Sequence, residues 1–491
     1  MVGLTGGAGP GDYDVVVVGS GPGGLQTAYW LRRLGIDHAV LSADEAPGGM
    51  FRTWPIFGRL LSWSKPDAPY AQSSREYEWY DHNSLLADEP ELRALVPQGM
   101  DRRYAVPTRE EMVAGHAAFA ERAGIAIRHG CRWEATRREP DGRLMLETSG
   151  GQYRCRAAVF AIGVTEPWRS PIPGIEAVPH YADTREAASY RDRRVFVIGK
   201  RNSGFELADG LLPWARQVVV ASPSPVRAEV LALSTVRVRY FQPLEDAVVG
   251  GGTLAVDAAI ESIERAGDGF RVRAQGTTQP GELVFEADDV IAATGFRAPL
   301  LDLPELGVVT VAQGRVPALT PFFESTSAPG VFFAGNATQG AAGLRREGVV
   351  STSAAVQGFR YNARILVEHL GERLGRPRPR PRVDPHELSA LLCDALARSP
   401  ELWAQKGYLA RAVTLEEPVD EGIVPLEHFV DMEGTNGVAV TVELDGAGRI
   451  FPSVYVRRRG KLRIERLDPH PLHAFDGEPY RRALTKLVEV A

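Results

Sequence analysis

Three glycines follow a run of valines near the start of the chain, and their spacing could bring the backbone against a phosphate group. Residues 15–18 are continuous and β-branched, as expected of a strand that is buried on both faces. In the G-x-G-x-x-G that follows, the first glycine allows a tight turn, the second lets backbone approach a pyrophosphate, and the third lets the helix pack closely on the strand. A helix expected from about residue 23 to 33 would aim its N–H groups at the phosphates. The sequence predicts a dinucleotide site in this turn, which consists of Gly19, Ser20, Gly21, Pro22, Gly23 and Gly24.

The next strand, HAVL, ends where such sites usually carry an acidic residue for a ribose hydroxyl. Ser42 occupies that position here, and Asp44 and Glu45 follow it. Ser42 could still hydrogen-bond a ribose, and Asp44 could reach it from the loop. The acidic neighbours argue against a 2′-phosphate at this site.

A second turn of similar outline lies at residues 194–213, RVFVIGKRNSGFELADGLLP. Gly199 keeps the tight turn and Gly204 keeps the close helix packing, but Arg201 replaces the middle glycine. Arg201 does not prevent the turn from forming if its φ is negative, and its guanidinium could pair with a phosphate. Asn202 and Ser203 complete the predicted site, and Ser203 could cap the helix or bind phosphate. The alternative is that Lys200 and Arg201 are solvated loop charges on a degenerate domain.

The strand after this turn, QVVVASPSPVR, bears on the choice of cofactor. It ends at Ser222, with Ser224 and Arg227 beyond it and no acid at the strand end. An acid there would bind a free 2′-hydroxyl, whereas hydroxyls and an arginine suit a 2′-phosphate. The sequence therefore favours NADPH over NADH.

Composition excludes several other classes of function. The net charge of −6 gives no reason to expect nucleic acid or an anionic membrane as a partner. The apolar runs are strand-sized, and the first twelve residues lack the pattern of a secretory signal. The three cysteines contain no C-x-x-C pair, so neither a dithiol centre nor a zinc ribbon is expected, and a reducing cytoplasm is the expected compartment. No metal site is predicted.

Further segments resemble the two-dinucleotide-binding flavoproteins. A glycine pair follows the acidic loop in APGGMFRTW, and a strand ends in AVFAIG (158–163). An A-T-G signature lies in VIAATGF (290–296). The closing flavin motif is resembled by GVFFAGNATQG (330–340), which has Asn336 where Asp is usual. The resemblance implies FAD at the first turn and NADPH at the second. Together with two tryptophans, it adds as cofactor-binding residues Gly48, Gly49, Met50, Trp54, Trp133, Gly163, Thr294, Gly295, Gly335 and Asn336.

The expected fold class is α/β, with two Rossmann-like three-layer nucleotide-binding domains and a small C-terminal α+β appendage. The NADPH domain is inserted into the FAD domain. Turns are expected at 445–446 and 459–460 in the appendage, and the alternating Arg and Pro of 375–385 read as a stiff linker or a wrapping arm. The predicted parts are 11–165 (FAD domain, first half), 166–296 (NADPH domain), 297–372 (FAD domain, second half), 373–385 (Pro/Arg linker) and 386–491 (appendage).

Residues 51–110 form an aromatic-rich insertion, which is either a substrate pocket or a compact subdomain packed on its own rings. Its polar pocket candidates are Ser64, Lys65, Arg75, His82 and Asn83. Thr108 and Glu111 have the spacing of a capping box at the start of a helix. His116, inside that helix, is expected to serve packing rather than catalysis.

The chain resembles single-component NADPH-dependent flavin monooxygenases over about residues 12–370, with some similarity to bacillithiol-disulfide-reductase-type enzymes. The first resemblance implies oxygenation of a small nitrogen- or sulfur-containing metabolite through a flavin C4a-hydroperoxide, with O₂ as co-substrate. A role in secondary metabolism is expected. Arg297 is the candidate catalytic charge near the nicotinamide or flavin edge. One alternative is an NADPH-dependent reductase of a disulfide or quinone, and another is a non-catalytic flavoprotein with a degenerate NADPH domain. The sequence leaves a homodimer open.

Overall fold

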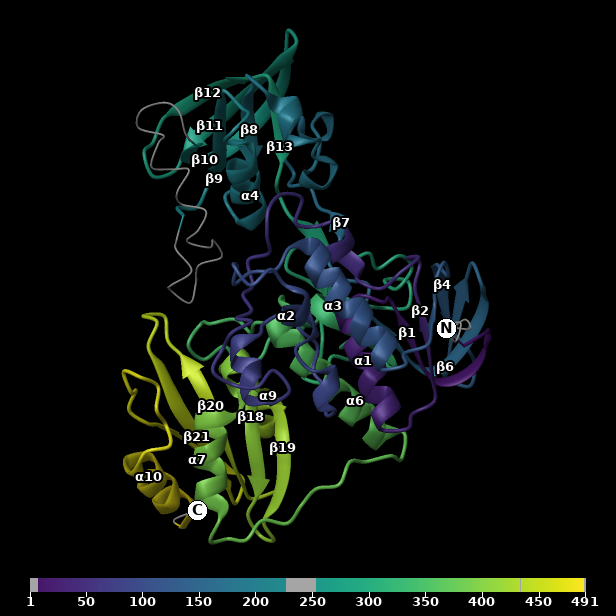
Figure 1. The fold of residues 1–491 in the computed structure, drawn as a ribbon, viewed down its shortest axis with the longest axis vertical. Coiled ribbons are helices and arrows are strands. Elements are labelled where there is room, and N and C mark those ends of the chain that lie inside the picture. The colour runs from purple at the N-terminus through teal and green to yellow at the C-terminus, as the bar shows by residue number, and fades with distance from the viewer. Residues whose placement is uncertain (1–7, 227–252, 433, 490–491) are drawn as a thin grey trace. The chain divides into compact units, whose positions relative to one another are not determined.

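The computed structural model describes residues 8–226, 253–432 and 434–489. Its chain divides into two compact units (Figure 1). Unit 1 comprises Met1–Arg52, Ser62–Val164 and Ala298–Ala491, and unit 2 comprises Thr53–Leu61 and Thr165–Arg297. The assignment of one nucleotide to each unit stays a proposal and is taken up below.

The first predicted turn lies in unit 1, directly after β1, an inner strand of a seven-stranded sheet. The strand order is β3-β2-β1-β6-β5-β4, and β17 also pairs with β6. β1 pairs in parallel with β2 and β6, so its valines are buried on both faces as predicted. The helices α1 and α6 pack along each other beside this sheet (Figure 1). The elements are β1 (Gly11–Val18), α1 (Pro22–Arg33), β2 (His38–Leu41), β3 (Ile127–Arg128), β4 (Trp133–Arg138), β5 (Leu144–Thr148), β6 (Gly151–Phe160), β17 (Val331–Phe333) and α6 (Val356–Arg373).

Residues 62–110 of the insertion and the helix after them also belong to unit 1, whereas residues 53–61 belong to unit 2. The helix α3 (Arg109–Arg122) begins with the predicted capping box, because Thr108 accepts a bond from the Glu111 N–H and Glu111 accepts one from the Thr108 N–H. Before it lie α2 (Leu95–Gly99) and the short 3₁₀ turns η1 (Gly49–Arg52), η2 (Glu76–Tyr80) and η3 (Pro90–Leu92). A further short pair is formed by β15 (Thr310–Val311) and β16 (Val316–Pro317).

Unit 2 is built on a six-stranded sheet of order β12-β11-β10-β9-β8-β13. Side chains of β8 alternate between two cores: Val195 and Val197 pack with Phe205 of α4, and Phe196 and Ile198 pack on the opposite face. The elements are β7 (Glu166–Pro167), η4 (Ile175–Ala177), η5 (Tyr181–Asp183), η6 (Ala187–Tyr190), β8 (Arg194–Ile198), α4 (Asn202–Leu211), β9 (Gln217–Ser222), β10 (Thr253–Ala266), β11 (Gly269–Gly276), β12 (Glu282–Ala287), β13 (Asp289–Ala292) and β14 (Phe296–Arg297).

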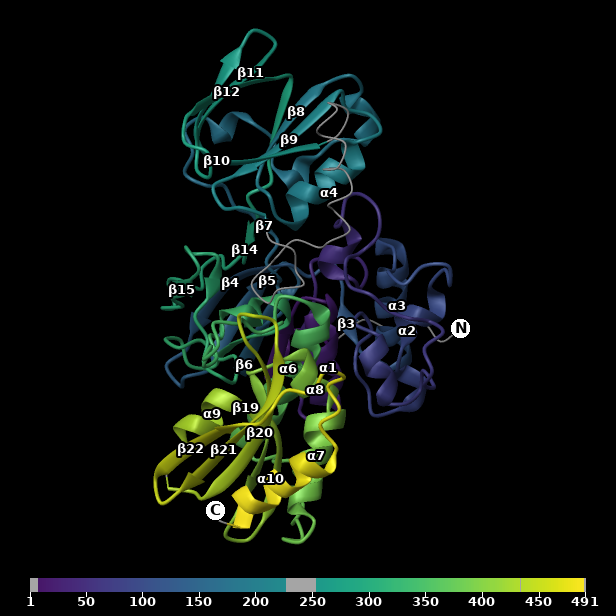
Figure 2. The ribbon, with the colours of Figure 1, turned by 90° about the vertical axis from the view of Figure 1, so that its left-hand side faces the viewer.

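The C-terminal appendage is α+β, as predicted. Its five antiparallel strands have the order β19-β18-β20-β21-β22. The connections span 445–449, which is longer than the predicted turn, and 459–460, as predicted. Figure 2 shows α7 and α10 together on one side of this sheet, whereas α9 packs on Ala412 and Tyr455. The elements are α7 (Leu388–Arg398), α8 (Pro400–Ala404), β18 (Leu409–Thr414), β19 (Val419–Pro425), α9 (Leu426–Asp431), β20 (Gly437–Leu444), β21 (Ile450–Arg458), β22 (Lys461–Arg466) and α10 (Glu478–Glu489).

The Arg/Pro segment 375–385 is extended and pairs its charges with elements on both sides. Arg378 Nε lies 2.9 Å from a Glu368 carboxylate oxygen on α6, and Arg380 Nη1 lies 2.9 Å from a Glu421 oxygen on β19. Its backbone also pairs with that of residues 418–420. Of the two arrangements that the sequence left open, the structure shows the wrapping arm.

Candidate functional site

The first glycine turn is packed so closely that side chains cannot replace three of its glycines. A Cβ added at Gly24 would lie 1.9 Å from the Gly19 carbonyl oxygen, and Gly19 itself has a φ of +113°. A Cβ at Gly23 would lie 2.4 Å from the Cα of Gly335. The closing motif, more than 300 residues away in the sequence, therefore lies directly against the start of α1.

The N-terminus of α1 is buried and has no side-chain cap. Gly21 is the N-cap residue, no acidic residue lies in the first turn, and Pro22, Gly23 and Gly24 are buried. A buried helix start that leaves its N–H groups without a side-chain acceptor is a site for an anion. This end of α1 fits the diphosphate that the sequence predicts there.

Segment 42–50 closes around the same turn. Ser20 donates a hydrogen bond to Ser42 at 2.8 Å, and the Asp44 N–H donates to the same Ser42 hydroxyl at 3.2 Å. Ser42 is only 3% exposed, whereas Asp44 is exposed. Ser42 is thus engaged inside the turn, and contact of exposed Asp44 with a ribose stays a prediction.

Some of the remaining predicted residues of unit 1 lie at the glycine turn, whereas Trp133 has another role. Asn336 Nδ2 lies 3.8 Å from Met50 Sδ, and an added Cβ at Gly49 would lie 2.8 Å from the Gly21 Cα, so these residues gather at the turn. Trp133 instead packs its ring on Phe160 and donates its N–H to Thr136, which gives it a packing role. Gly163, just beyond β6, has a φ of +75°.

In unit 2, the second turn repeats this construction despite its missing glycine. Gly199 has a φ of +130°, and a Cβ at Gly204 would lie 2.1 Å from the Gly199 carbonyl oxygen. Arg201 has an extended backbone with a φ of −116°, which any residue can adopt, so the replacement costs the turn nothing. The start of α4 has no side-chain cap and no acidic residue in its first turn.

One detail of this turn differs from expectation. Ser203 does not cap α4: the N-cap residue is Arg201, so Ser203 lies inside the first turn of the helix. The Asn202 Oδ1 atom is buried and has no hydrogen-bond partner among the described residues. The helix start thus retains unused polar groups, which fits a bound nucleotide.

Lys200 is not a solvated loop charge, which corrects that alternative for Lys200 but not for Arg201, which is exposed. Its side chain is 1% exposed and forms an ion pair with Asp257 of β10, which also accepts a hydrogen bond from Thr278 at 2.7 Å. Asp257 pairs in register with Ser222, so an acid does lie beside the strand end, on the neighbouring strand. The hydrogen bond from Lys200 lowers the pKa of Asp257. Arg227 lies outside the described residues.

The predicted residues near the C-terminal end of unit 2 bond to the segment with which unit 2 resumes after residue 164. Thr294 donates to the Trp168 carbonyl at 2.5 Å, and the Gly295 carbonyl accepts from Trp168 N–H at 2.9 Å. Arg297 is paired with Glu166 at 2.5 Å, and about half of its side chain is exposed. Trp54 packs on Phe296. The charge of Arg297 is therefore balanced within the short β7–β14 pair, and its catalytic role stays a prediction.

The predicted site residues thus fall into two sets. Unit 1 holds Gly19, Ser20, Gly21, Pro22, Gly23, Gly24, Ser42, Asp44, Gly48, Gly49, Met50, Trp133, Gly163, Gly335 and Asn336. Unit 2 holds Trp54, Gly199, Arg201, Asn202, Ser203, Gly204, Ser222, Thr294, Gly295 and Arg297.

The three cysteines are free and buried. Burial raises the pKa of the Cys155 thiol to about 12 and also raises the pKa of Cys393. Cys131 donates to Thr148, and Cys393 donates to the Phe475 carbonyl. A thiolate is the reactive form of cysteine, so these thiols are poorly suited to redox exchange.

The polar candidates of the insertion are occupied by contacts within unit 1. Ser64 donates to Asp81 at 2.5 Å, Asn83 donates to Ser64 at 3.0 Å, and Arg75 pairs with Glu401 at 2.5 Å. His116 is fully buried, its Nε2 lies 3.1 Å from the Asn83 carbonyl, and burial lowers its pKa to about 4. His116 therefore packs, as predicted.

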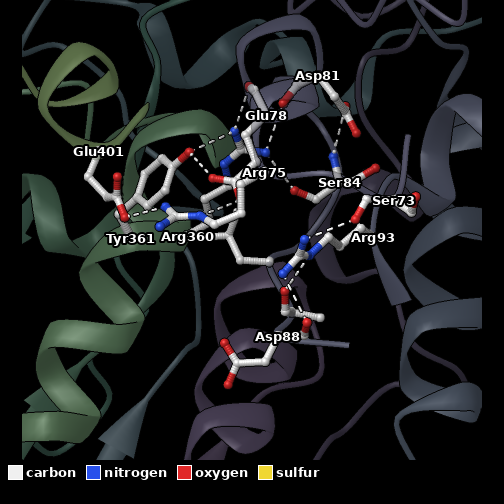
Figure 3. Close-up of polar contacts among 12 residues, drawn as sticks. Ser73, Arg75, Glu78, Asp81, Ser84, Asp88, Arg93, Arg360, Tyr361 and Glu401 are labelled. Carbon is white, nitrogen blue, oxygen red and sulfur yellow. Dashed lines mark hydrogen bonds and ion pairs between the residues drawn. The ribbon is translucent and has the colours of Figure 1, made fainter. Parts of the chain in front are cut away.

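Figure 3 shows a residue that the sequence analysis missed. Arg360 of α6 is buried and donates to the backbone carbonyls of Asp81, Ser84 and Glu78 at 2.8–3.2 Å. It also donates to the hydroxyl of Tyr361 at 3.2 Å. Residues 358–363 of α6 are all buried, but this burial is visible only in the structure, and no local sequence pattern marks Arg360. Arg360 bonds the insertion to α6, which is a structural role. It lies far from both glycine turns in the sequence.

None of the helices in residues 8–226, 253–432 and 434–489 combines the length and apolar content that a membrane crossing requires. Within the same ranges, no cluster of three or more His, Cys, Asp or Glu could hold a metal ion.

Comparison with curated proteins finds several flavoprotein relatives. The chain is 24% identical to an FAD-dependent oxidoreductase domain-containing protein 2 of Danio rerio over 74% of this chain and 59% of that protein. It spans only 33% of the corresponding protein of Mus musculus. It is 27% identical to a ferredoxin–NADP reductase of Salinispora arenicola, over 67% of this chain and 87% of the relative. A flavin-containing monooxygenase of Arabidopsis thaliana is 27% identical over 65% of this chain and 68% of the relative.

Solved structures share the fold. The bacillithiol disulfide reductase of Staphylococcus aureus is 17% identical with a TM-score of 0.56, and covers 74% of this chain and 99% of its own. A flavin-containing monooxygenase of Stenotrophomonas maltophilia is 22% identical with a TM-score of 0.55, over 74% of this chain and 99% of its own. The predicted pair of Rossmann-like domains and the resemblance to these two groups are confirmed. Because residues 16–335 match the family described as pyridine nucleotide-disulphide oxidoreductase, the chain belongs to that family.

Proposed function

We propose that this chain is an FAD- and NADPH-dependent monooxygenase that oxygenates a small nitrogen- or sulfur-containing metabolite. The family and its relatives make the chain a flavin-dependent oxidoreductase. The observation that carries the proposal is the repeated construction of two uncapped helix starts, α1 in unit 1 and α4 in unit 2, each behind a closely packed glycine turn. Each fits one dinucleotide diphosphate.

The residues suggest a division of binding roles. The start of α1 would hold the FAD diphosphate, Asp44 would hydrogen-bond the ribose, and Asn336 would contact the flavin side. The start of α4 would hold the NADPH diphosphate, with Arg201 beside it. Lys200 neutralises Asp257 next to Ser222, which leaves this strand end compatible with a 2′-phosphate. Bound FAD supplies hydride acceptance from NADPH and electron transfer to a second acceptor.

The choice of oxygen as the second acceptor is supported by the cysteines. The chain has three, all of them buried and without disulfides, so it has no dithiol of its own to receive electrons. The sequence relationship to a flavin-containing monooxygenase points the same way. No protein acid or base is required by this proposal.

The test is an aerobic screen of amines and thioethers for coupled NADPH oxidation, followed by ¹⁸O₂ labelling of the product. Incorporation of one labelled oxygen supports the proposal. Gly204→Ala should abolish NADPH oxidation with FAD still bound, since its Cβ would collide with the Gly199 carbonyl. Gly99→Ala is the matched control, because nothing lies within 4 Å of its added Cβ.

A second candidate is an NADPH-dependent reductase of an external disulfide or quinone. Its support is the ferredoxin–NADP reductase relative, which matches over 87% of its own length. NADPH oxidation that proceeds equally well without oxygen, given a disulfide or quinone acceptor, would favour this candidate. A flavin that stays yellow on anaerobic mixing with NADPH would instead indicate a non-catalytic flavoprotein.

A further inference from the structure

Unit 1 contains a cavity that the glycine turns do not touch. It has a volume of about 300 Å³ and lies among α6, the wrapping arm and the appendage strands β18, β19 and β20, with α9 beside them. This volume is at the lower end of the range for small-molecule sites. It would hold about ten non-hydrogen atoms if each took roughly the 30 Å³ that water occupies in the liquid.

One wall of the cavity is aromatic and apolar. Phe322 stacks on the His369 ring, with centroids 4.3 Å apart, and meets His428 edge-on at 4.7 Å. Ile365, Val424 and Phe429 also line the cavity. Burial lowers the pKa of both histidines, so neither contributes a full positive charge near pH 7. This wall suits an aryl or alkyl group.

Most charges that line the cavity are already paired. Arg378 pairs with Glu368, and Arg380 pairs with Glu372 and Glu421. Arg364, which lies outside the lining, also pairs with Glu368 at 2.9 Å, so three arginines face the three carboxylates of the lining. The three carboxylates disfavour a doubly charged phosphate.

Arg457 is the exception. It lines the cavity, is 3% exposed and lies over the Phe429 ring at 4.5 Å. Its Nη2 atom is buried and has no hydrogen-bond partner among the described residues. The exposed Asp431 carboxylate attracts its charge but forms no ion pair with it. A buried guanidinium stays protonated, and a buried charge without a partner is costly. Such a group at the wall of a cavity is the anchor expected for an anion.

We propose that this cavity binds a small monocarboxylate with an aryl or alkyl body, whose carboxylate pairs with Arg457. The aromatic wall provides for the body of the ligand, and among the described residues of the lining Arg457 is the charged group that lacks an ion-pair partner. The proposal is independent of the proposed monooxygenase function, since no residue of the two glycine turns lines this cavity.

The test measures dissociation constants on the full-length protein with benzoate, 3-phenylpropionate and hexanoate, each beside its neutral amide. We expect at least one acid to bind with a Kd of about 1 mM or tighter, and its amide to bind at least about tenfold more weakly. Equal binding of acid and amide, or no binding of any acid up to about 10 mM, would overturn the proposal.

Variants locate the site. Arg457→Gln should weaken binding of the acid at least about tenfold, and Arg457→Lys, which retains the charge and is the less disruptive change, should weaken it less. Arg458→Gln, at the next and exposed position of β21, is the matched control and should bind as the unchanged protein does. Undiminished binding by a folded Arg457→Gln protein would place the carboxylate elsewhere and overturn the assignment.

Discussion

At the scale of single residues, comparison of the two turns shows which positions require glycine. The first and third positions require it, and the middle position of the second turn does not. The third glycine of each turn, Gly24 or Gly204, faces the carbonyl of the first glycine at a distance that excludes a Cβ. The middle position of the second turn is extended, so Arg201 fits there. This part of the site could be predicted from the sequence, because a turn and its helix are local.

The burial of Lys200 could not be predicted in this way. Its partner, Asp257, is 57 residues further along the chain and reaches it only because β10 pairs with β9. Sequence spacing alone gave no sign that these two strands are neighbours. The acid beside Ser222 was therefore missed together with the lysine that neutralises it.

Lys200→Met should shift the preference for NADPH toward NADH. The change leaves the Asp257 carboxylate without its ammonium partner, beside the strand end proposed for the 2′-phosphate, and its charge would repel that phosphate. We expect the Kd for NADPH to rise about tenfold or more and that for NADH to change less, as measured by anaerobic titration. Adding Asp257→Asn should restore much of the preference. Equal weakening for both cofactors would show that this pair does not influence the choice.

At the scale of elements, patterns that act within one segment were predicted well. The capping box of α3 and the two turns of the appendage depend on residues a few positions apart. The wrapping arm and Arg360 depend on partners that the folded chain brings from far away, such as Glu421 for Arg380 and Asp81 for Arg360. No local pattern encodes those partners.

Arg360→Met should destabilise unit 1 strongly. The change leaves the carbonyls of Asp81, Ser84 and Glu78 without their buried donor, which should cost roughly 3–5 kcal/mol in the free energy of unfolding. Arg93 also donates to three backbone carbonyls, but from a half-buried position (Figure 3). Arg93→Met is therefore the matched control, with a smaller expected loss. Denaturant unfolding of both variants measures the difference, and equal losses would contradict the role given to burial.

At the scale of the whole molecule, the chain passes between the two compact units four times, at 52/53, 61/62, 164/165 and 297/298. The short segment 53–61 belongs to unit 2 although its sequence neighbours belong to unit 1. Within unit 2, Glu206 of α4 accepts hydrogen bonds from the Phe57 N–H at 2.8 Å and the Tyr181 hydroxyl at 2.6 Å. Trp54, Ile56, Phe57 and Leu61 also pack on the core of unit 2. A motif-based domain boundary could not find this excursion, because it depends on contacts with residues far away in the sequence.

Two compact units, each with its own sheet and core, should respond separately to their nucleotides. NADPH at about 100 times its Kd adds roughly 2.7 kcal/mol to the stability of the part that binds it. We therefore expect hydrogen exchange to slow in peptides from 165–226 and 253–297 when NADPH is added to the FAD-loaded protein, with less change in the sheet of residues 11–18 and 151–160. Gly204→Ala should remove this protection, and Gly99→Ala should retain it, since only the first places a Cβ against backbone. Equal protection of both regions would contradict independent units, and protection confined to unit 1 would place the NADPH site at the other glycine turn.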